Sequence, residues 1–142
     1  MRAALATIDL DAIRQNFARV RALAPQSRVL AVVKADAYGH GLERVARALS
    51  AVDGYGVASL DDAERLRAIG IRQRIVLLGG FDDPRDLPLL RALDLDTVLH
   101  APEQLRMLEL DRGTPIRVWP KLDTGMHRLG FAWTDARVLA AR

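Results

Sequence analysis

The sequence predicts an α/β fold in which parallel strands alternate with helices. Short apolar runs rich in Val, Ile and Leu alternate with segments whose apolar residues recur every three or four positions. Glycines stand at many joints between the two kinds of segment, namely Gly54, Gly56, Gly70, Gly79 and Gly80. This alternation is typical of consecutive βα units that share one parallel sheet.

The first predicted element is an amphipathic helix over residues 10–24. Asp9 is a suitable N-cap, and Pro25 ends the helical pattern. The apolar residues between them recur at spacings of three and four, at Leu10, Ile13, Phe17, Val20 and Leu23. The helix is therefore expected to pack along one face.

A strand is predicted next, over residues 28–33, with Lys34 at its carboxyl end. Its run of apolar and β-branched residues is continuous, which is typical of a strand buried on both faces of a parallel sheet. The same alternation continues along the chain and predicts helix 41–50, strand 56–59, helix 61–69, strand 74–79, helix 84–92, strand 96–100, helix 102–110, strand 115–121 and a last helix that begins near Thr134.

Two architectures accommodate these five βα units. A complete doubly wound domain suits a chain of 142 residues, whereas an eight-stranded barrel requires roughly 250. Periodicity and length alone favour the doubly wound sheet. In both folds ligands bind at the carboxyl ends of the strands, where Lys34 and Lys121 fall.

The composition excludes several classes of function. The chain has no cysteine, which excludes a disulfide framework, a thiolate nucleophile and a cysteine-ligated metal site. Its net charge is +3, but the basic residues are interspersed with 18 acidic ones and form no patch for nucleic acid. No apolar stretch reaches the ~20 residues that span a bilayer, and no signal peptide is recognisable. The chain is expected to be cytoplasmic, with no membrane or nucleic-acid partner.

Lysine is rare in this sequence. Of the 21 lysines and arginines, only Lys34 and Lys121 are lysines. A lysine in such an arginine-rich chain suggests chemistry that a guanidinium cannot perform, such as attack on a carbonyl or reaction with carbon dioxide.

The first lysine lies in the segment Ala31-Val-Val-Lys-Ala-Asp-Ala-Tyr-Gly-His-Gly41. An amine held at a strand end can form a Schiff base with an aldehyde cofactor, and the phenol of Tyr38 can hydrogen-bond a phosphate. The alternatives are that Lys34 is a solvated charge, that Tyr38 anchors a loop, and that Gly39 and Gly41 serve only the turn and the helix entry.

The second lysine lies in the segment Val118-Trp-Pro-Lys-Leu-Asp-Thr-Gly-Met-His-Arg-Leu-Gly-Phe131. Lys121 and Arg128 repel one another unless an anion lies between them or one loses its charge. This indicates an anionic ligand, or a carbamylated Lys121. The alternative is that Asp123 pairs with one of the two cations and that the loop is structural.

These two segments resemble the alanine racemase family, and the likeness covers essentially the whole chain in family order. The resemblance implies a pyridoxal 5'-phosphate enzyme of fold type III, with an N-terminal (β/α)8 barrel, a C-terminal β-domain and a head-to-tail homodimer. Residues 1–142 then form a partial barrel domain with about five of the eight βα units, and the β-domain is absent. The doubly wound alternative gives way to the TIM-type barrel.

The family's site residues map onto matching positions of this sequence. Lys34 matches the lysine that binds the cofactor and acts as a catalytic base, and Tyr38 matches the tyrosine that supports the cofactor phosphate. Arg128 matches the arginine near the cofactor oxygen and the substrate carboxylate, and Lys121 matches a lysine that is carbamylated in many members. No metal is implied.

The implied activity is the interconversion of L-alanine and D-alanine through a cofactor-stabilised carbanion, for peptidoglycan or for alanine catabolism. The family's second catalytic group, a tyrosine from the partner subunit, has no counterpart here, because Tyr55 is expected to precede the second strand. Pro120 also removes a backbone donor beside Lys121. The 142 residues are therefore expected to be a truncated piece that is inactive alone; the alternative is a non-catalytic module that binds pyridoxal phosphate, of the homeostasis type.

Overall fold

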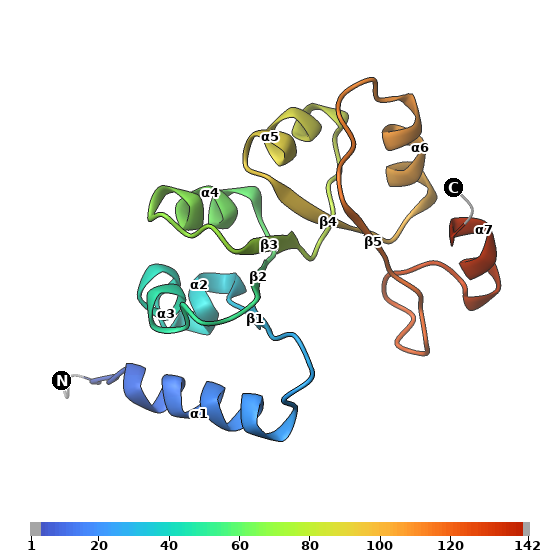
Figure 1. The fold of residues 1–142 in the computed structure, drawn as a ribbon. Helices are drawn as coiled ribbons and strands as arrows, with labels where there is room; N and C mark the ends of the chain where they lie inside the picture. The colour runs from blue at the N-terminus through green and yellow to red at the C-terminus, as the bar shows by residue number, and fades with distance from the viewer. Residues whose placement is uncertain (1–3, 141–142) are drawn as a thin grey trace.

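The protein folds as a curved parallel sheet with helices around its outer side (Figure 1). The computed structural model describes residues 4–140, so residues 1–3 and 141–142 of the predicted domain lie outside the described residues. Five strands make up the sheet: β1 (Leu30–Val32), β2 (Gly54–Val57), β3 (Arg74–Leu77), β4 (Leu95–Leu99) and β5 (Val118–Pro120). Each strand pairs in parallel with the next one in the chain.

The helices follow the strands in the predicted order. They are α1 (Leu10–Leu23), α2 (Lys34–Gly39), α3 (Leu42–Ala48), α4 (Leu60–Ala68), η1 (Pro84–Asp86), α5 (Leu87–Ala92), α6 (Pro102–Leu110), η2 (Trp133–Asp135) and α7 (Ala136–Ala140). The predicted N-cap of α1 is present, because the Asp9 carboxylate accepts hydrogen bonds from the backbone N–H groups of Asp11 and Ala12. Ser59 caps α4 in the same way through the N–H of Asp62. No helix within residues 4–140 has the length and apolar character to cross a membrane.

The order of the strands distinguishes the two architectures. The sheet runs β1-β2-β3-β4-β5, with no reversal of direction. A doubly wound sheet reverses its strand order at the ligand-binding crevice, whereas a barrel adds its strands in sequence. The doubly wound preference from periodicity was therefore wrong, and the prediction of five βα units of a (β/α)8 barrel is confirmed.

The two faces of the sheet differ in their packing. The outer face packs against the helices in the main core, through residues that include Tyr55, Ile75, Leu77, Leu95 and Leu99. The inner face is open on the side where further strands of a barrel stand, and Val32 is 41% exposed there. The prediction that strand 28–33 is buried on both faces was therefore wrong.

Strand β2 begins two residues earlier than predicted, and this changes the place of Tyr55. Gly54 and Gly56 lie within the strand rather than at its joints. Glycine is suited to position 54 because a Cβ there would come within 2.8 Å of the backbone oxygen of Arg74. Tyr55 is fully buried between the two glycines. Its hydroxyl donates to the carbonyl oxygens of Ala46 at 2.8 Å and Leu49 at 3.1 Å. Tyr55 therefore does not precede the second strand but holds α3 against it.

Candidate active site

A cavity of about 590 Å³ lies at the carboxyl ends of the strands. Its lining combines the ends of all five strands with the loop after β5: Lys34, Ala58, Leu78, Gly79, Val98, Trp119, Pro120, Lys121, Arg128 and Leu129. Three of the four predicted site residues thus share one cavity, although Lys34 and Arg128 lie 94 positions apart in the sequence. This is the end of a barrel at which ligands bind.

Lys34 stands where β1 passes into an unusual turn. The backbone N–H of Val33 donates to the oxygen of Gly56 at 2.9 Å, which fixes the strand end beside β2. The next four residues, Ala35 to Tyr38, all have φ between 52° and 55°, so α2 is a left-handed turn. Left-handed backbone costs a residue other than glycine about 1–2 kcal/mol. No residue pattern in the sequence predicts this turn, so contacts with residues outside the turn must hold it.

Asp36 and Arg65 supply those contacts. Oδ1 of Asp36 accepts a hydrogen bond from the N–H of Leu42 at 2.8 Å and one from Nη2 of Arg65 at 3.2 Å. The Leu42 N–H, and next the Arg65 guanidinium, lower the pKa of the Asp36 carboxyl. Arg65 also binds Glu43 through its Nε at 2.8 Å. One side chain of α4 thus ties the turn after Lys34 to the start of α3.

Tyr38 ends this turn but lies outside the cavity lining. Its side chain is 60% exposed. The neighbouring His40 folds back on the turn, with Nδ1 2.9 Å from the carbonyl oxygen of Ala37. The structure therefore brings Lys34, Lys121 and Arg128 together and leaves Tyr38 beside them on the surface.

Lys121 follows β5 directly and keeps the strand pairing intact. Its backbone N–H donates to the oxygen of Leu99 at 2.8 Å. Pro120 pairs with Leu99 in the register of the sheet, so the missing donor at Pro120 does not interrupt the ladder to β4. Lys121 consequently reaches the cavity as the sequence predicts.

The loop from Lys121 to Phe131 is closed at its base and braced within. The N–H of Asp123 donates to Phe131 O, and the N–H of Phe131 donates to Lys121 O, both at 2.8 Å. The Asp123 carboxylate accepts from the N–H groups of Gly125 at 2.9 Å and His127 at 3.0 Å, and it contacts Nδ1 of His127 at 2.9 Å. The two backbone donors are the main reason why the pKa of Asp123 falls to about 2.

This arrangement decides what Asp123 does. The sequence left open whether Asp123 pairs with Lys121 or Arg128, and within the described residues its carboxylate binds His127 and the loop backbone instead. The loop is structural in the sense that Asp123 braces it. Its two cations nevertheless remain available to a ligand.

The cavity is therefore strongly basic. Within residues 4–140, neither Lys34, Lys121 nor Arg128 forms a salt bridge, and the lining contains no acidic side chain. Like charges confined to one concave surface repel one another and attract anions. The described residues contain no cluster of three or more metal-ligating side chains. An anionic ligand that carries an electrophilic carbonyl matches these groups.

Sequence reasoning missed three residues that shape the site: Arg65, Asp96 and Trp119. A signal existed for Trp119, because it precedes Lys121 by two positions and so shares its face of the strand. Asp96 lies in a predicted buried strand, where a carboxylate requires partners. Arg65 offered no signal, because its partners Asp36 and Glu43 lie more than 20 residues away in the chain.

Comparison with known proteins agrees with this geometry. Residues 8–142 match the family model for the N-terminal domain of alanine racemase. The biosynthetic alanine racemase of Salmonella typhimurium is 51% identical over 143 residues, which cover 100% of this chain and 40% of the relative. The chain thus spans about two fifths of the length of this curated relative.

Solved structures give the same picture. The biosynthetic alanine racemase from Pseudomonas aeruginosa matches with a TM-score of 0.92 and 44% identity, over 100% of this chain and 40% of that one. A histidine racemase from Leuconostoc mesenteroides matches with a TM-score of 0.81 and 28% identity, over 93% of this chain and 37% of that one. The same half-barrel thus occurs in racemases named for different amino acids.

Proposed function

The chain belongs to the alanine racemase family, and from this premise we propose that its cavity is part of the active site of a pyridoxal 5'-phosphate enzyme that interconverts L-alanine and D-alanine. The observation that carries the proposal is the position of Lys34, an amine at a strand end in a cavity with two further cations. Residues 1–142 then contribute the first five βα units of a (β/α)8 barrel. From the resemblance we also expect a cytoplasmic homodimer.

The residues of the cavity fit this cofactor. Pyridoxal phosphate is an anion with an aldehyde, and the cavity offers an amine and two other cations without an acidic group among its lining residues. The Lys34 amine would bond to the aldehyde carbon with release of water, and the exposed phenol of Tyr38 would support the phosphate. When bound, the cofactor withdraws electrons from the bond between Cα and hydrogen of an amino acid and so makes that proton removable.

Lys34 and Arg128 have different roles in this proposal. Lys34, once the substrate amine has replaced it at the aldehyde carbon, would remove or return the proton at Cα on one face of the substrate. Arg128 neutralises the substrate carboxylate with charge-assisted hydrogen bonds. The loop braced by Asp123 carries Arg128, so the guanidinium is presented from a fixed base.

Lys121 lies beside Arg128 in the cavity lining. We expect its amine to react with carbon dioxide and release a proton, which gives a carbamate with a negative charge. This carbamate would orient the Arg128 guanidinium and remove one of the repelling positive charges. Without it, Lys121 would remain a third cation for an anionic ligand.

Racemisation also requires a proton donor on the opposite face of the substrate. Among residues 4–140, the side chain of Tyr55 is buried in the core on the outer face of the sheet, and Tyr38 lies outside the cavity lining. We therefore expect this group from another part of the enzyme, and the resemblance suggests a tyrosine of the partner subunit. For residues 1–142 taken alone, this favours a second candidate function, binding of pyridoxal phosphate without turnover.

The scarcity of lysine gives a direct test. The chain is incubated with pyridoxal 5'-phosphate and reduced with borohydride, and the modified residue is mapped by mass spectrometry of peptides. Only Lys34, Lys121 and the terminal amine can form the adduct. We expect modification at Lys34, its loss in Lys34→Arg and its retention in Lys121→Arg. Modification confined to Lys121 or the terminus would refute the proposal, and an adduct without D-alanine formation would support binding alone.

A further inference from the structure

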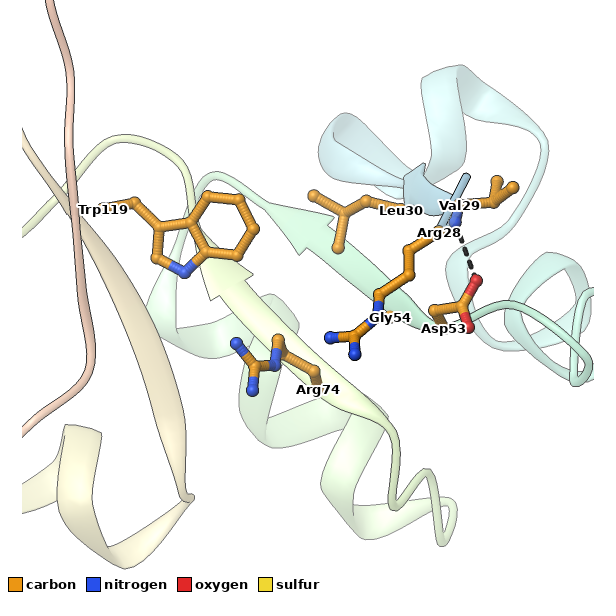
Figure 2. A pocket seen from close by; sticks show the side chains of 7 residues that line it. All are labelled: Arg28, Val29, Leu30, Asp53, Gly54, Arg74 and Trp119. Atoms are coloured by element: carbon orange, nitrogen blue, oxygen red, sulfur yellow. Dashed lines mark hydrogen bonds between the residues drawn. The ribbon is translucent and has the colours of Figure 1, made fainter. Parts of the chain in front are cut away.

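Trp119 lies between two cavities on the inner face of the sheet. It lines the basic cavity at the carboxyl ends of the strands, and it also lines a second cavity of about 440 Å³ at their amino ends. Figure 2 shows its indole at one side of the second cavity, opposite Arg28 and above Arg74. The ring therefore forms a partition between the two ends of the half-barrel.

The orientation of this ring is fixed by a buried carboxylate. Asp96 of β4 is 0% exposed. Its Oδ2 accepts a hydrogen bond from Nε1 of Trp119 at 2.8 Å and one from Nη1 of Arg74 at 2.9 Å, and its Oδ1 accepts from Nε of Arg117 at 2.7 Å. These donors come from β3, from β5 and from the residue before β5, so one carboxylate links three adjacent strands.

The contacts of Asp96 divide into two kinds. Arg74 and Arg117 compensate its charge, without which a buried carboxylate would be unstable. The bond to Trp119 adds no charge compensation. An indole has a single N–H donor, so this bond determines which way the ring faces.

The position of Trp119 also connects it to the reacting end of the barrel. Residues two apart on a strand share one face, so Trp119 and Lys121 both face inward, with Trp119 one layer deeper. Trp119 is 44% exposed in this chain, and it is one of the residues that line the cavity. Most of the other lining residues at that depth are small or aliphatic, such as Ala58, Leu78 and Val98.

We propose that Trp119 is the floor of the ligand site and that Asp96 is a positioning residue that acts through Trp119. The floor closes the site toward the amino ends of the strands and sets how deep an aromatic or apolar part of a bound molecule can lie. The choice of probe, pyridoxal 5'-phosphate, rests on the proposed function. Any ligand that enters this cavity would meet the indole of Trp119 at the same depth.

The two tryptophans of the sequence permit a direct test in the full chain. Trp133→Phe leaves Trp119 as the reporter, and the matched variant Trp119→Phe leaves Trp133, which is 70% exposed in η2. Acrylamide quenching of fluorescence is measured with and without pyridoxal 5'-phosphate, and the adduct at Lys34 is mapped in the same samples. We expect the cofactor to shield Trp119 from acrylamide and to leave Trp133 as accessible as before.

Every combination of these readouts is decisive. An adduct at Lys34 without shielding of Trp119 would overturn the floor and leave the proposed function standing. Shielding without an adduct would support the floor and count against the chemistry assigned to Lys34. The absence of both would overturn both.

The role of Asp96 is tested by two variants that both remove its charge. Asp96→Asn keeps an oxygen that can accept from the indole, whereas Asp96→Ala does not. We expect Asp96→Ala to need about fivefold more cofactor for half-maximal shielding than Asp96→Asn, the factor that one ordinary hydrogen bond gives. Equal behaviour of the two variants would overturn the positioning role. A further measurement does not depend on whether the Asp96 variants fold. In Trp133→Phe the only remaining indole N–H is that of Trp119, and its NMR resonance should exchange slowly with water. Rapid exchange would contradict the hydrogen bond from this N–H to Asp96.

Discussion

Nη2 of Arg65 lies 3.2 Å from Oδ1 of Asp36, and this contact joins α4 to the left-handed turn that follows Lys34. The same guanidinium binds Glu43 through Nε and Asp62 through Nη1. The hydrogen bonds to Glu43 and Asp36 raise the pKa of Arg65, and its side chain lowers the pKa of Glu43. A strained segment at a candidate catalytic lysine is thus held by a residue from a different βα unit.

Replacing Arg65 should affect Lys34 more than it affects global stability. Arg65 is 43% exposed, and exposed ion pairs contribute about 0.2–1 kcal/mol. We expect Arg65→Gln to leave the midpoint of urea unfolding nearly unchanged, because exposed ion pairs contribute little, while it slows borohydride-trapped adduct formation at Lys34 several-fold. Arg47→Gln, at an exposed position of α3, is the matched control and should change neither. Equal adduct rates in the two variants would show that the turn holds its shape without Arg65.

The loop that carries Arg128 should lose its internal bracing in acid. The pKa of Asp123 is depressed from 3.8 to about 2 in the folded state. A depressed carboxyl pKa stabilises the fold above the unfolded value and loses that contribution as the pH falls through the folded value. We expect the backbone N–H groups of Gly125 and His127 to lose their protection from hydrogen exchange between about pH 4 and pH 2.

A local measurement is needed because Asp83 titrates in the same range. Hydrogen bonds from Arg85 lower the pKa of Asp83 to about 2, so a global unfolding curve contains both groups. Asp123→Asn is the control, and its Gly125 and His127 amides should show no transition in this range. A transition that persists in Asp123→Asn would assign the effect to another group.

Two glycines of this loop should respond differently to the same substitution. Gly130 has φ of 122°, and a Cβ there would lie 2.8 Å from the nitrogen of Asp123. Gly125 has φ of 137°, with no atom within 4 Å of such a Cβ. Both Ala variants strain the backbone by about 1–3 kcal/mol, but Gly130→Ala adds a clash of about 1–3 kcal/mol at the loop base.

Urea unfolding of the two variants measures this difference. We expect Gly130→Ala to be the less stable one, and to weaken binding of pyridoxal 5'-phosphate because Arg128 is displaced with the loop. If Gly125→Ala were equally destabilised, backbone strain alone would account for the loss of stability in both variants. The close approach of Gly130 to Asp123 would then make no measurable contribution.

Local patterns predicted the succession of elements but not how the strands meet. The spacing of Leu10, Ile13 and Phe17 located α1, and the rarity of lysine pointed to Lys34 and Lys121. Choosing between the doubly wound sheet and the barrel required the resemblance, because both architectures use the same βα repeat. The order of the strands depends on pairing between distant segments, and the hydrophobic periodicity of the sequence does not determine which strands pair.

The errors share the same physical origin. Gly54 and Gly56 were predicted at joints, but they lie inside β2, where the backbone of Arg74 approaches Gly54 and the side chain of Leu78 approaches Gly56. Asp36 holds the left-handed turn through the N–H of Leu42 and the guanidinium of Arg65, and no local preference of Ala or Tyr favours this conformation. The position of Asp96 in a predicted buried strand implied that its carboxylate has partners, but the sequence did not identify them, because Arg74, Arg117 and Trp119 lie more than 20 residues away in the chain.

Loss of the hydroxyl should affect stability at Tyr55 and ligand binding at Tyr38. Tyr55 donates to two carbonyl oxygens, and burial raises its pKa to about 12. Tyr55→Phe should therefore lower the free energy of unfolding by about 1 kcal/mol, the usual contribution of a hydrogen bond, and leave cofactor binding unchanged. Tyr38 is exposed, so Tyr38→Phe should change stability by less than about 0.5 kcal/mol.

The expected effect of Tyr38→Phe lies in ligand binding instead. If its phenol supports the cofactor phosphate, the variant should bind pyridoxal 5'-phosphate more weakly, while it binds pyridoxal, which lacks the phosphate, as well as the parent does. Fluorescence titrations with the two aldehydes measure this contrast, and Tyr55→Phe supplies the control for a hydroxyl removed elsewhere. An equal loss of affinity for both aldehydes would indicate that Tyr38 shapes the turn after Lys34 rather than contacting a phosphate.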